Sequence, residues 1–228
     1  MRLRAAGRGR FVTFEGGEGA GKTTQIARLA ARLRAEGVAV VTTREPGGSP
    51  RAEALRAKLL SGRAAPLGPL AEATLFTAAR IDHLDTLIEP ALARGAWVLC
   101  DRFADSTRAY QGALGRVDLR MIALLEHVAL GATRPDLTII LDLPAKDGLA
   151  RAALRRGDGA DADRFEREGE VFHESLRRAF MDIAAAEPDR CCVVNASLPE
   201  DEVARAIWQL ILSRFGAGAP EQLAAAAS

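Results

Sequence analysis

The chain has 228 residues, which is enough to bury the core of one α/β domain. Hydrophobic residues make up 48% and charged residues 27%, a balance that excludes a disordered chain and a membrane-embedded one. The formal charge of +1 gives no support for broad binding to nucleic acid or to an anionic membrane surface, so we expect neither partner.

The first ten residues, MRLRAAGRGR, are basic and lack the apolar segment of a secretory signal. A trimmed organelle-targeting arm would also be basic, but we expect a short disordered extension ahead of the domain. Cys100, Cys191 and Cys192 lie in or beside apolar runs without metal-ligand spacing. We therefore expect buried thiols in a reducing cytoplasm rather than a zinc site.

Short apolar runs predict strands, and the amphipathic segments between them predict helices. The predicted strands are 11–15, 38–43, 96–100, 137–143 and 191–195, and the predicted helices are 23–36, 70–93, 119–130, 164–186 and 199–215. Because the strands are almost continuously apolar, they indicate a parallel sheet that is covered on both faces. The alternation predicts a doubly wound α/β fold with five parallel strands, in a single domain over 11–215. An Ala-rich tail over 216–228 is expected to be disordered.

The strongest local signal directly follows the first predicted strand. Residues 16–23 read G-x-x-x-x-G-K-T, between an apolar strand and an amphipathic helix, as a P-loop requires. Glycines let backbone N–H groups surround a polyphosphate, and the helix N-terminus adds positive charge. We expect Lys22 to reach the β- and γ-phosphates of ATP and Thr23 to bind Mg²⁺. The expected ATP-binding residues are Gly16, Gly17, Glu18, Gly19, Ala20, Gly21, Lys22, Thr23 and Thr24.

A second polar signal follows the predicted strand 96–100. There, Asp101 can hold Mg²⁺ or its water shell, and Arg102 can clamp a phosphate. The alternative is a salt bridge at the strand end. A GTPase would need a guanine-reading N-K-x-D, and a transporter ATPase would need LSGGQ. The fourth predicted strand ends in Leu-Asp-Leu-Pro, and residues 60–63 contain only a fragment of LSGGQ, so both classes lose support.

Taken together, the motifs resemble those of bacterial-type thymidylate kinases. They are EGGEGAGKTT at 15–24, TREPGG at 43–48, LFTAAR at 75–80, DRFADSTRAYQG at 101–112, RPDLTIILD at 134–142 and DRFE at 163–166. They occur in that family's order, over about residues 11–215. The resemblance implies a P-loop nucleoside monophosphate kinase fold that transfers the γ-phosphate of Mg²⁺-ATP to dTMP. It also implies a homodimer and a mobile lid over about 151–163.

The resemblance further implies a binding site for dTMP. Phe76 would stack on the thymine ring, although its helical spacing alone favours ordinary core packing. Arg80 would contact the base, Arg102 would take the acceptor phosphate, and Tyr110 would leave no room for a ribose 2′-hydroxyl. A core tyrosine and a solvated loop arginine are the alternatives for Tyr110 and Arg44. The implied dTMP-binding residues are Arg44, Phe76, Arg80, Arg102, Ser106, Thr107, Tyr110 and Gln111.

The resemblance also assigns catalytic roles. Glu18 would contact the acceptor sugar hydroxyl or the magnesium shell. Since residues 17–20 contain no arginine, the transition-state cation is expected from the lid, as Arg155 or Arg156. A solvated basic helix face is the alternative for these arginines. The expected catalytic residues are Lys22, Glu18, Arg102, Arg155 and Arg156, and the expected metal ligands are Thr23 and Asp101. A kinase for another nucleoside monophosphate and a P-loop ATPase switch remain the alternative functions.

Overall fold

The computed structural model describes residues 7–156 and 164–216, apart from the side chain of Arg156. Within these residues, five parallel strands form one sheet in the order β2-β3-β1-β4-β5. They are β1 (Phe11–Gly16), β2 (Val40–Arg44), β3 (Trp97–Asp101), β4 (Leu137–Asp142) and β5 (Cys191–Asn195). Each lies within two residues of a predicted strand, so the predicted parallel sheet is confirmed.

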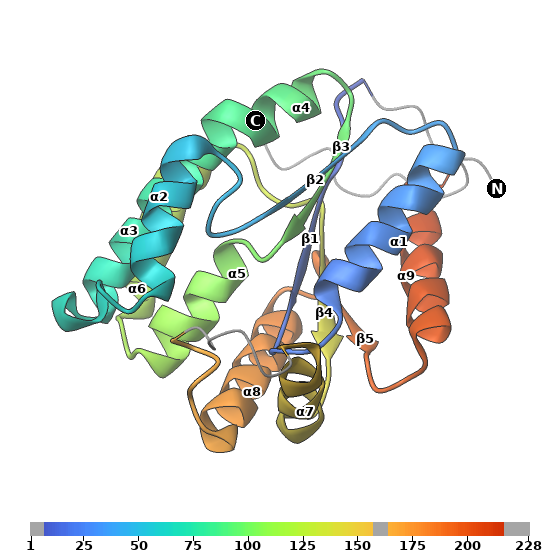
Figure 1. The fold of residues 1–228 in the computed structure, drawn as a ribbon. Helices are drawn as coiled ribbons and strands as arrows, with labels where there is room; N and C mark the ends of the chain where they lie inside the picture. Colours follow the sequence, from blue (N-terminus) through green and yellow to red (C-terminus); the bar gives the residue numbers. More distant parts are fainter. Residues whose placement is uncertain (1–6, 157–163, 217–228) are drawn as a thin grey trace.

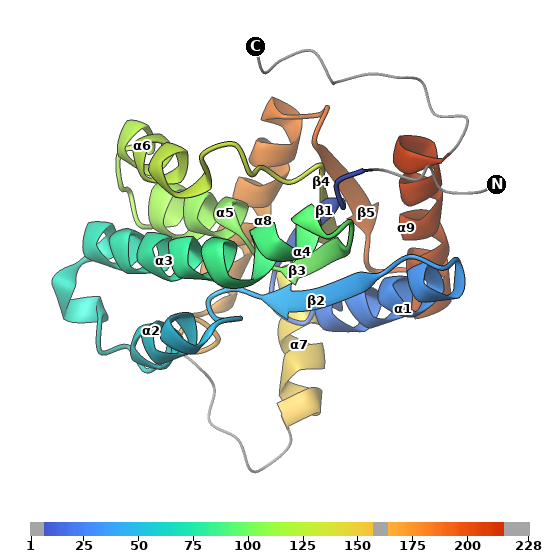
Figure 2. The ribbon, with the colours of Figure 1, turned by 90° about the horizontal axis from the view of Figure 1, so that it is seen from above.

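Helices cover both faces of the sheet (Figures 1 and 2). On one face, α1 (Lys22–Ala35) and α9 (Glu200–Phe215) pack against β1, β3 and β4 through a core that includes Leu33 and Ile211. The other face carries two further apolar clusters, one around Phe103 and one around Phe180. The remaining helices are α2 (Pro50–Leu60), α3 (Pro69–His83), α4 (Glu89–Ala93), α5 (Ala104–Thr107), α6 (Leu119–Leu130), α7 (Ala145–Arg156) and α8 (Glu170–Ala186).

The predicted helix 70–93 is one helical path that contains a π-helical turn, Leu84–Ile88, between α3 and α4. The predicted start of the helix at 164 is wrong, because α8 begins at Glu170 after the extended N-cap Gly169. Turns occupy the preceding residues, and the ring of Phe165 packs edge-on against Tyr110 at 5.0 Å. The predicted helices omit four helical segments of the described chain: α2, the 3-10 helix Ala65–Leu67, α7, and the path from α5 into the π-helix Arg108–Leu114.

The N-terminal extension is joined to the domain over its described residues. The amide of Gly9 donates to the carbonyl of Leu92 at 2.8 Å, and Arg10 forms an ion pair with Asp136 at 3.1 Å. The disordered extension that we expected is therefore wrong for these two residues. No helix in 7–156 or 164–216 combines the length and hydrophobicity that a membrane span requires.

The topology brings polar residues together at one edge of the sheet. Because β3 and β4 lie on either side of β1, the carboxyl end of β1 lies at a switch point, where α/β folds bind ligands. In the strand register, Asp101 of β3 pairs with Phe14 of β1 and with Arg44 of β2. The carboxyl ends of these three strands therefore meet at the start of the P-loop.

Helix α7 reaches the same loop through a close backbone contact. A Cβ atom added at Gly148 would lie 2.3 Å from the carbonyl oxygen of Glu18, so only glycine fits there. This contact fixes the start of α7 against the P-loop, and it places the arginines of α7 near the carboxyl edge of the sheet.

Candidate active site

A cavity of about 540 Å³ opens at this edge and collects most of the predicted site residues. From the predicted set, its walls include Glu18, Gly19, Ala20, Gly21, Lys22, Thr23, Thr24, Arg44, Phe76, Arg80, Asp101, Arg102, Ser106, Thr107, Tyr110, Gln111 and Arg155. Gly16 and Gly17 contribute carbonyls beneath Lys22. The side chain of Arg156 lies outside the described part of the chain.

The P-loop encloses its lysine. Lys22 is 8% exposed, and its Nζ donates to the carbonyls of Gly16 at 3.1 Å and Gly17 at 2.8 Å. Gly16 has a φ of 133°, and an added Cβ would lie 2.5 Å from the carbonyl oxygen of Leu141, so this position requires glycine. Burial and the neighbouring Arg102 lower the pKa of Lys22 to about 8.

Thr23 and Asp101 form a pair of oxygen donors beside the loop. The hydroxyl of Thr23 donates to Oδ2 of Asp101 at 2.9 Å, whereas the alternative salt bridge at the strand end is not formed among the described residues. Hydroxyl and carboxylate oxygens suit a hard divalent cation. Among the described residues, no three His, Cys, Asp or Glu side chains form a metal-ligand cluster. A cation here would therefore take its other ligands from phosphate and water, as Mg²⁺ commonly does.

Glu18 lies among three cationic side chains. Its carboxylate is 2.9 Å from Nη2 of Arg155 and 3.9 Å from Nη2 of Arg102. Although burial alone would raise the pKa of Glu18, the charges of Lys22, Arg102 and Arg155 hold it at about 2. Glu18 is therefore ionised at neutral pH, and it connects α7 to the loop.

Arg102 leaves β3 in an uncommon backbone conformation with a φ of 65°. Its Nη1 donates to the carbonyl of Gly16 at 3.2 Å and to Oγ of Ser106 at 3.3 Å. The guanidinium lies 5.4 Å from the centre of the Tyr110 ring. These contacts hold one cation between the P-loop and the aromatic wall of the cavity.

The cavity wall also contains a buried ion pair. Arg80 is 3% exposed, and its Nε donates to Oε2 of Glu45 at 2.8 Å, while its Nη2 donates to Oγ1 of Thr107 at 3.1 Å. The ring of His83 bonds to Glu45 at 3.2 Å and to Thr43 at 2.7 Å. Arg80 is therefore held rigidly before any ligand binds.

Aromatic side chains also line the cavity, and two of them, Phe76 and Tyr110, belong to the predicted set. Phe76 is half-buried and lines the cavity, which differs from ordinary core packing. Tyr110 is also half-buried and lines the cavity, between Arg102 and Phe165. Arg44 is exposed, although it too borders the cavity, and it pairs with Glu53 at 3.0 Å.

Sequence reasoning missed several residues of this site. Glu15, Glu45 and His83 are buried and bonded to predicted site residues or their neighbours. For Glu15 and Glu45 the available signal was an acidic residue inside a motif. His173 carried no such signal. It is 3% exposed and lines the cavity, and within the described part of the chain neither of its ring nitrogens has a hydrogen-bond partner of ordinary geometry.

Comparisons with known proteins agree on one family. The family model described as thymidylate kinase matches residues 14–207. A thymidylate kinase of Bradyrhizobium diazoefficiens is 57% identical over 212 residues, which cover 93% of this chain and 92% of the relative. A thymidylate kinase of Rhodopseudomonas palustris is 58% identical over 209 residues, which cover 91% of this chain and 90% of the relative.

A solved structure is also similar to this chain. It is a thymidylate kinase from Ehrlichia chaffeensis, with a TM-score of 0.70 and 33% sequence identity. The match covers 90% of this chain and 98% of that one. The family model's match over 14–207 spans every residue that lines the cavity described above, from Glu18 to His173.

The unpaired ring of His173 gives a stability prediction. We expect His173→Phe to leave the ligand-free protein at least as stable as wild type, because each unpaired buried nitrogen costs about 1–3 kcal/mol. Burial lowers the pKa of His173, so the folded chain binds fewer protons than the unfolded chain. Wild type should therefore lose stability as the pH falls below about 6.5. The variant has no histidine at this position and should not show this part of the loss.

Urea unfolding at neutral and mildly acidic pH measures both effects. The matched control is His83→Phe, which removes an equally buried ring whose two nitrogens are bonded, and which should destabilise the protein. If His173→Phe destabilised the protein as much as His83→Phe at neutral pH, the account of His173 would be contradicted.

Proposed function

This chain belongs to the thymidylate kinase family, and on that premise we propose that it transfers the γ-phosphate of ATP to dTMP. The single observation that carries the proposal is that one cavity is lined both by the P-loop and by the predicted acceptor residues. Phosphoryl transfer needs donor and acceptor phosphates in line and shielded from water, and little covalent chemistry from the protein.

On the donor side, the P-loop amides and Lys22 bind the phosphates of ATP. Lys22 already lies within the loop, and ATP oxygens exchange for the carbonyls of Gly16 and Gly17 as its partners. Thr23 and Asp101 are the residues that would hold Mg²⁺. When bound, the ion neutralises charge on the β- and γ-phosphates.

On the acceptor side, Arg102 binds the phosphate of dTMP. Its guanidinium sits between Gly16 and Tyr110, next to the donor loop. Phe76 stacks on the base, where an aromatic face contributes about 1–3 kcal/mol. Arg80 contacts the base from its fixed position against Glu45. Tyr110 faces the sugar and, with Gln111 behind it, excludes a ribose 2′-hydroxyl.

The hydroxyls of Ser106 and Thr107 have a more specific role than direct contact with the base. Each lines the cavity and accepts a hydrogen bond from a cavity arginine, Ser106 from Arg102 and Thr107 from Arg80. We therefore propose that they orient these arginines toward dTMP. Glu18 lies near Arg102 and contacts the acceptor sugar hydroxyl or the magnesium shell.

Arg155 is the proposed source of transition-state charge. It extends from α7 to Glu18 of the P-loop, and its side chain is 64% exposed. Arg151, one turn earlier on α7, donates to the carbonyl of Ala196 at 3.1 Å. The proposed lid covers about residues 151–163, of which 157–163 lie outside the described part of the chain.

A homodimer in the cytoplasm completes the proposal. Helix α6 presents Met121, Leu124 and Val128 along one side, and these side chains are 39%, 55% and 66% exposed. Their spacing makes an apolar stripe that a second copy of the chain can cover. The three unpaired cysteines are compatible with a reducing compartment.

A panel of acceptors with Mg²⁺-ATP tests the proposed reaction. We expect dTMP to be the preferred acceptor over dUMP, AMP and GMP, with formation of ADP and dTDP. Preference for another monophosphate would support the alternative kinase. ATP hydrolysis stimulated by a protein partner, with no acceptor turnover, would support the ATPase switch and contradict the proposal.

Removal of the lid cation should affect turnover more than acceptor binding. We expect Arg155→Ala to lower kcat by roughly 10³-fold, with a modest change in the KM for dTMP, because its charge acts in the transition state. Lys146→Ala, an exposed cation on the same helix, is the control and should stay near wild type. Arg151→Ala and Arg156→Ala complete the series. A steep loss in Arg156→Ala instead would move the role to Arg156, and no steep loss in any variant would exclude a lid cation.

The proposed interface predicts the mass of the particle in solution. Light scattering should give about twice the 24.3 kDa chain mass for wild type. Leu124→Glu should shift the particle toward the monomer, because it places a charge in the apolar stripe. Val171→Glu, an exposed apolar position on α8, should leave the mass unchanged. A monomeric wild type would refute the homodimer.

A further inference from the structure

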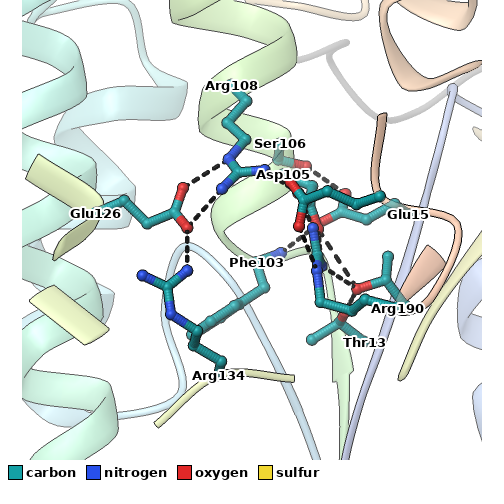
Figure 3. Close-up of polar contacts among 11 residues, drawn as sticks. Thr13, Glu15, Phe103, Asp105, Ser106, Arg108, Glu126, Arg134 and Arg190 are labelled. Carbon is teal, nitrogen blue, oxygen red and sulfur yellow. Dashed lines mark hydrogen bonds and ion pairs between the residues drawn. The ribbon is translucent and has the colours of Figure 1, made fainter. Parts of the chain in front are cut away.

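Glu15 is a buried acid beside the P-loop. It lies one residue before Gly16 in β1, and its side chain is 0% exposed. Oε1 accepts a hydrogen bond from the backbone N–H of Phe103, and Oε2 accepts one from the hydroxyl of Ser106, both at 2.7 Å (Figure 3). Both donors belong to the segment that follows β3 and contains Arg102. A buried carboxylate is costly unless it is bonded in this way.

The bond to Ser106 determines the direction of its hydroxyl. A serine hydroxyl has one proton, and an ionised carboxylate can only accept. Because the proton points to Glu15, the lone pairs of Oγ remain available to Nη1 of Arg102 at 3.3 Å. Glu15 therefore holds the guanidinium through one intermediate hydroxyl.

The bond to Phe103 holds the backbone on the other side. Arg102 has a φ of 65°, a conformation that costs a non-glycine residue about 1–3 kcal/mol and requires support from its surroundings. The amide of Arg102 donates to the carbonyl of Phe14 at 2.9 Å, and the next amide donates to Glu15. Two successive amides are thus fixed by β1, and the side chain between them is aimed at the loop.

A polar network keeps Glu15 available for these two bonds. Burial and the negative charge of Asp105 raise the pKa of Glu15 to about 7, whereas Arg102 and the hydrogen bonds from Ser106 and Phe103 favour its ionised form. Arg190 takes both oxygens of Asp105, at 2.6 and 2.9 Å, and donates to Thr138 at 2.6 Å (Figure 3). Thr138 in turn bonds to Thr13 at 2.8 Å. Because Asp105 is already paired with Arg190, it does not compete with Glu15 for the hydrogen bonds from Phe103 and Ser106.

We propose that Glu15 is a positioning residue that holds Arg102 in place for the acceptor phosphate, through Ser106 and the backbone of Phe103. This inference rests on the proposed function, in which Arg102 binds the phosphate of dTMP. It adds a residue that touches no substrate and sets the specificity of the site for a phosphorylated acceptor.

Glu15→Gln tests the proposal with little change in shape. The amide oxygen still accepts from Phe103, but the amide nitrogen donates to Ser106 and occupies one lone pair of Oγ. The hydroxyl proton then turns away from residue 15, which disturbs the hydrogen bond from Arg102. We expect the Kd of dTMP, measured by calorimetry, to rise roughly tenfold. The Kd of thymidine, which lacks the phosphate, should stay near wild type. Loss of a merely structural residue would weaken both ligands alike.

Three further variants make the outcome decisive. Thr133→Val removes a buried hydrogen bond to Glu89, outside the chain of contacts around Glu15, and should leave the ratio of the two Kd values unchanged. Ser106→Ala breaks the link to Arg102 while Glu15 stays intact, so it should weaken dTMP selectively even if Glu15→Gln fails to fold. The double variant Glu15→Gln with Ser106→Ala should lose little more than either single variant, because both act on one chain of bonds.

Arg102→Met separates the two levels of the proposal. If it weakens dTMP selectively while Glu15→Gln and Ser106→Ala leave the ratio unchanged, the positioning role is overturned and the proposed function stands. If Arg102→Met leaves the ratio unchanged, Arg102 does not bind the acceptor phosphate, and both fail. Equal weakening of dTMP and thymidine in Glu15→Gln and in Ser106→Ala would also overturn the positioning role.

Discussion

Three cationic side chains lie close together around the P-loop, although their like charges repel one another. The surrounding structure holds them in place against this repulsion. Lys22, Arg102 and Arg155 all lie close to Glu18, whose pKa they hold at about 2 against the effect of burial. The same crowding contributes to lowering the pKa of Lys22 to about 8. Such like charges repel one another unless an anion lies between them. A polyphosphate and an acceptor phosphate would relieve this repulsion, in agreement with the proposal that two phosphorylated nucleotides bind in this cavity.

The fold supplies the supports for this cluster from distant parts of the sequence. The carboxyl ends of β1 and β3 bring Gly16 and Arg102 together. Gly148 lets α7 approach the P-loop closely enough for Arg155 to reach Glu18. Each cation is therefore held by a different element, and a small shift of any one element changes the spacing of the cations around Glu18.

The extent to which the sequence predicts this site depends on whether a signal is local. The P-loop could be assigned residue by residue, because its glycines, lysine and threonine are consecutive and lie between a clear strand and a clear helix. The hydrogen-bond partners of Ser106 and Thr107 could not be assigned from the sequence, because they depend on how the segment after β3 packs against β1 and α3. Sequence alone left Arg155 and Arg156 equivalent, and the contact of Arg155 with Glu18 could be seen only in three dimensions.

The secondary structure shows the same limit. The strands were predicted within two residues, because each is a short apolar run with no competing pattern. The start of α8 was misplaced, because Arg164 to Glu168 has good helix formers whose path is set instead by the packing of Phe165 on Tyr110. His173 gave no signal at all, since a lone histidine on a helix is equally compatible with core packing.

The central claim is that Lys22 exchanges loop carbonyls for the phosphates of ATP, and Lys22→Met tests it most directly. Turnover of dTMP and thermal unfolding should be measured together, with Lys58→Met, an exposed lysine on α2, as the control. The account predicts a folded Lys22→Met protein whose kcat falls by roughly 10²-fold or more, and a control near wild type. A folded Lys22→Met protein with near-normal turnover would contradict it.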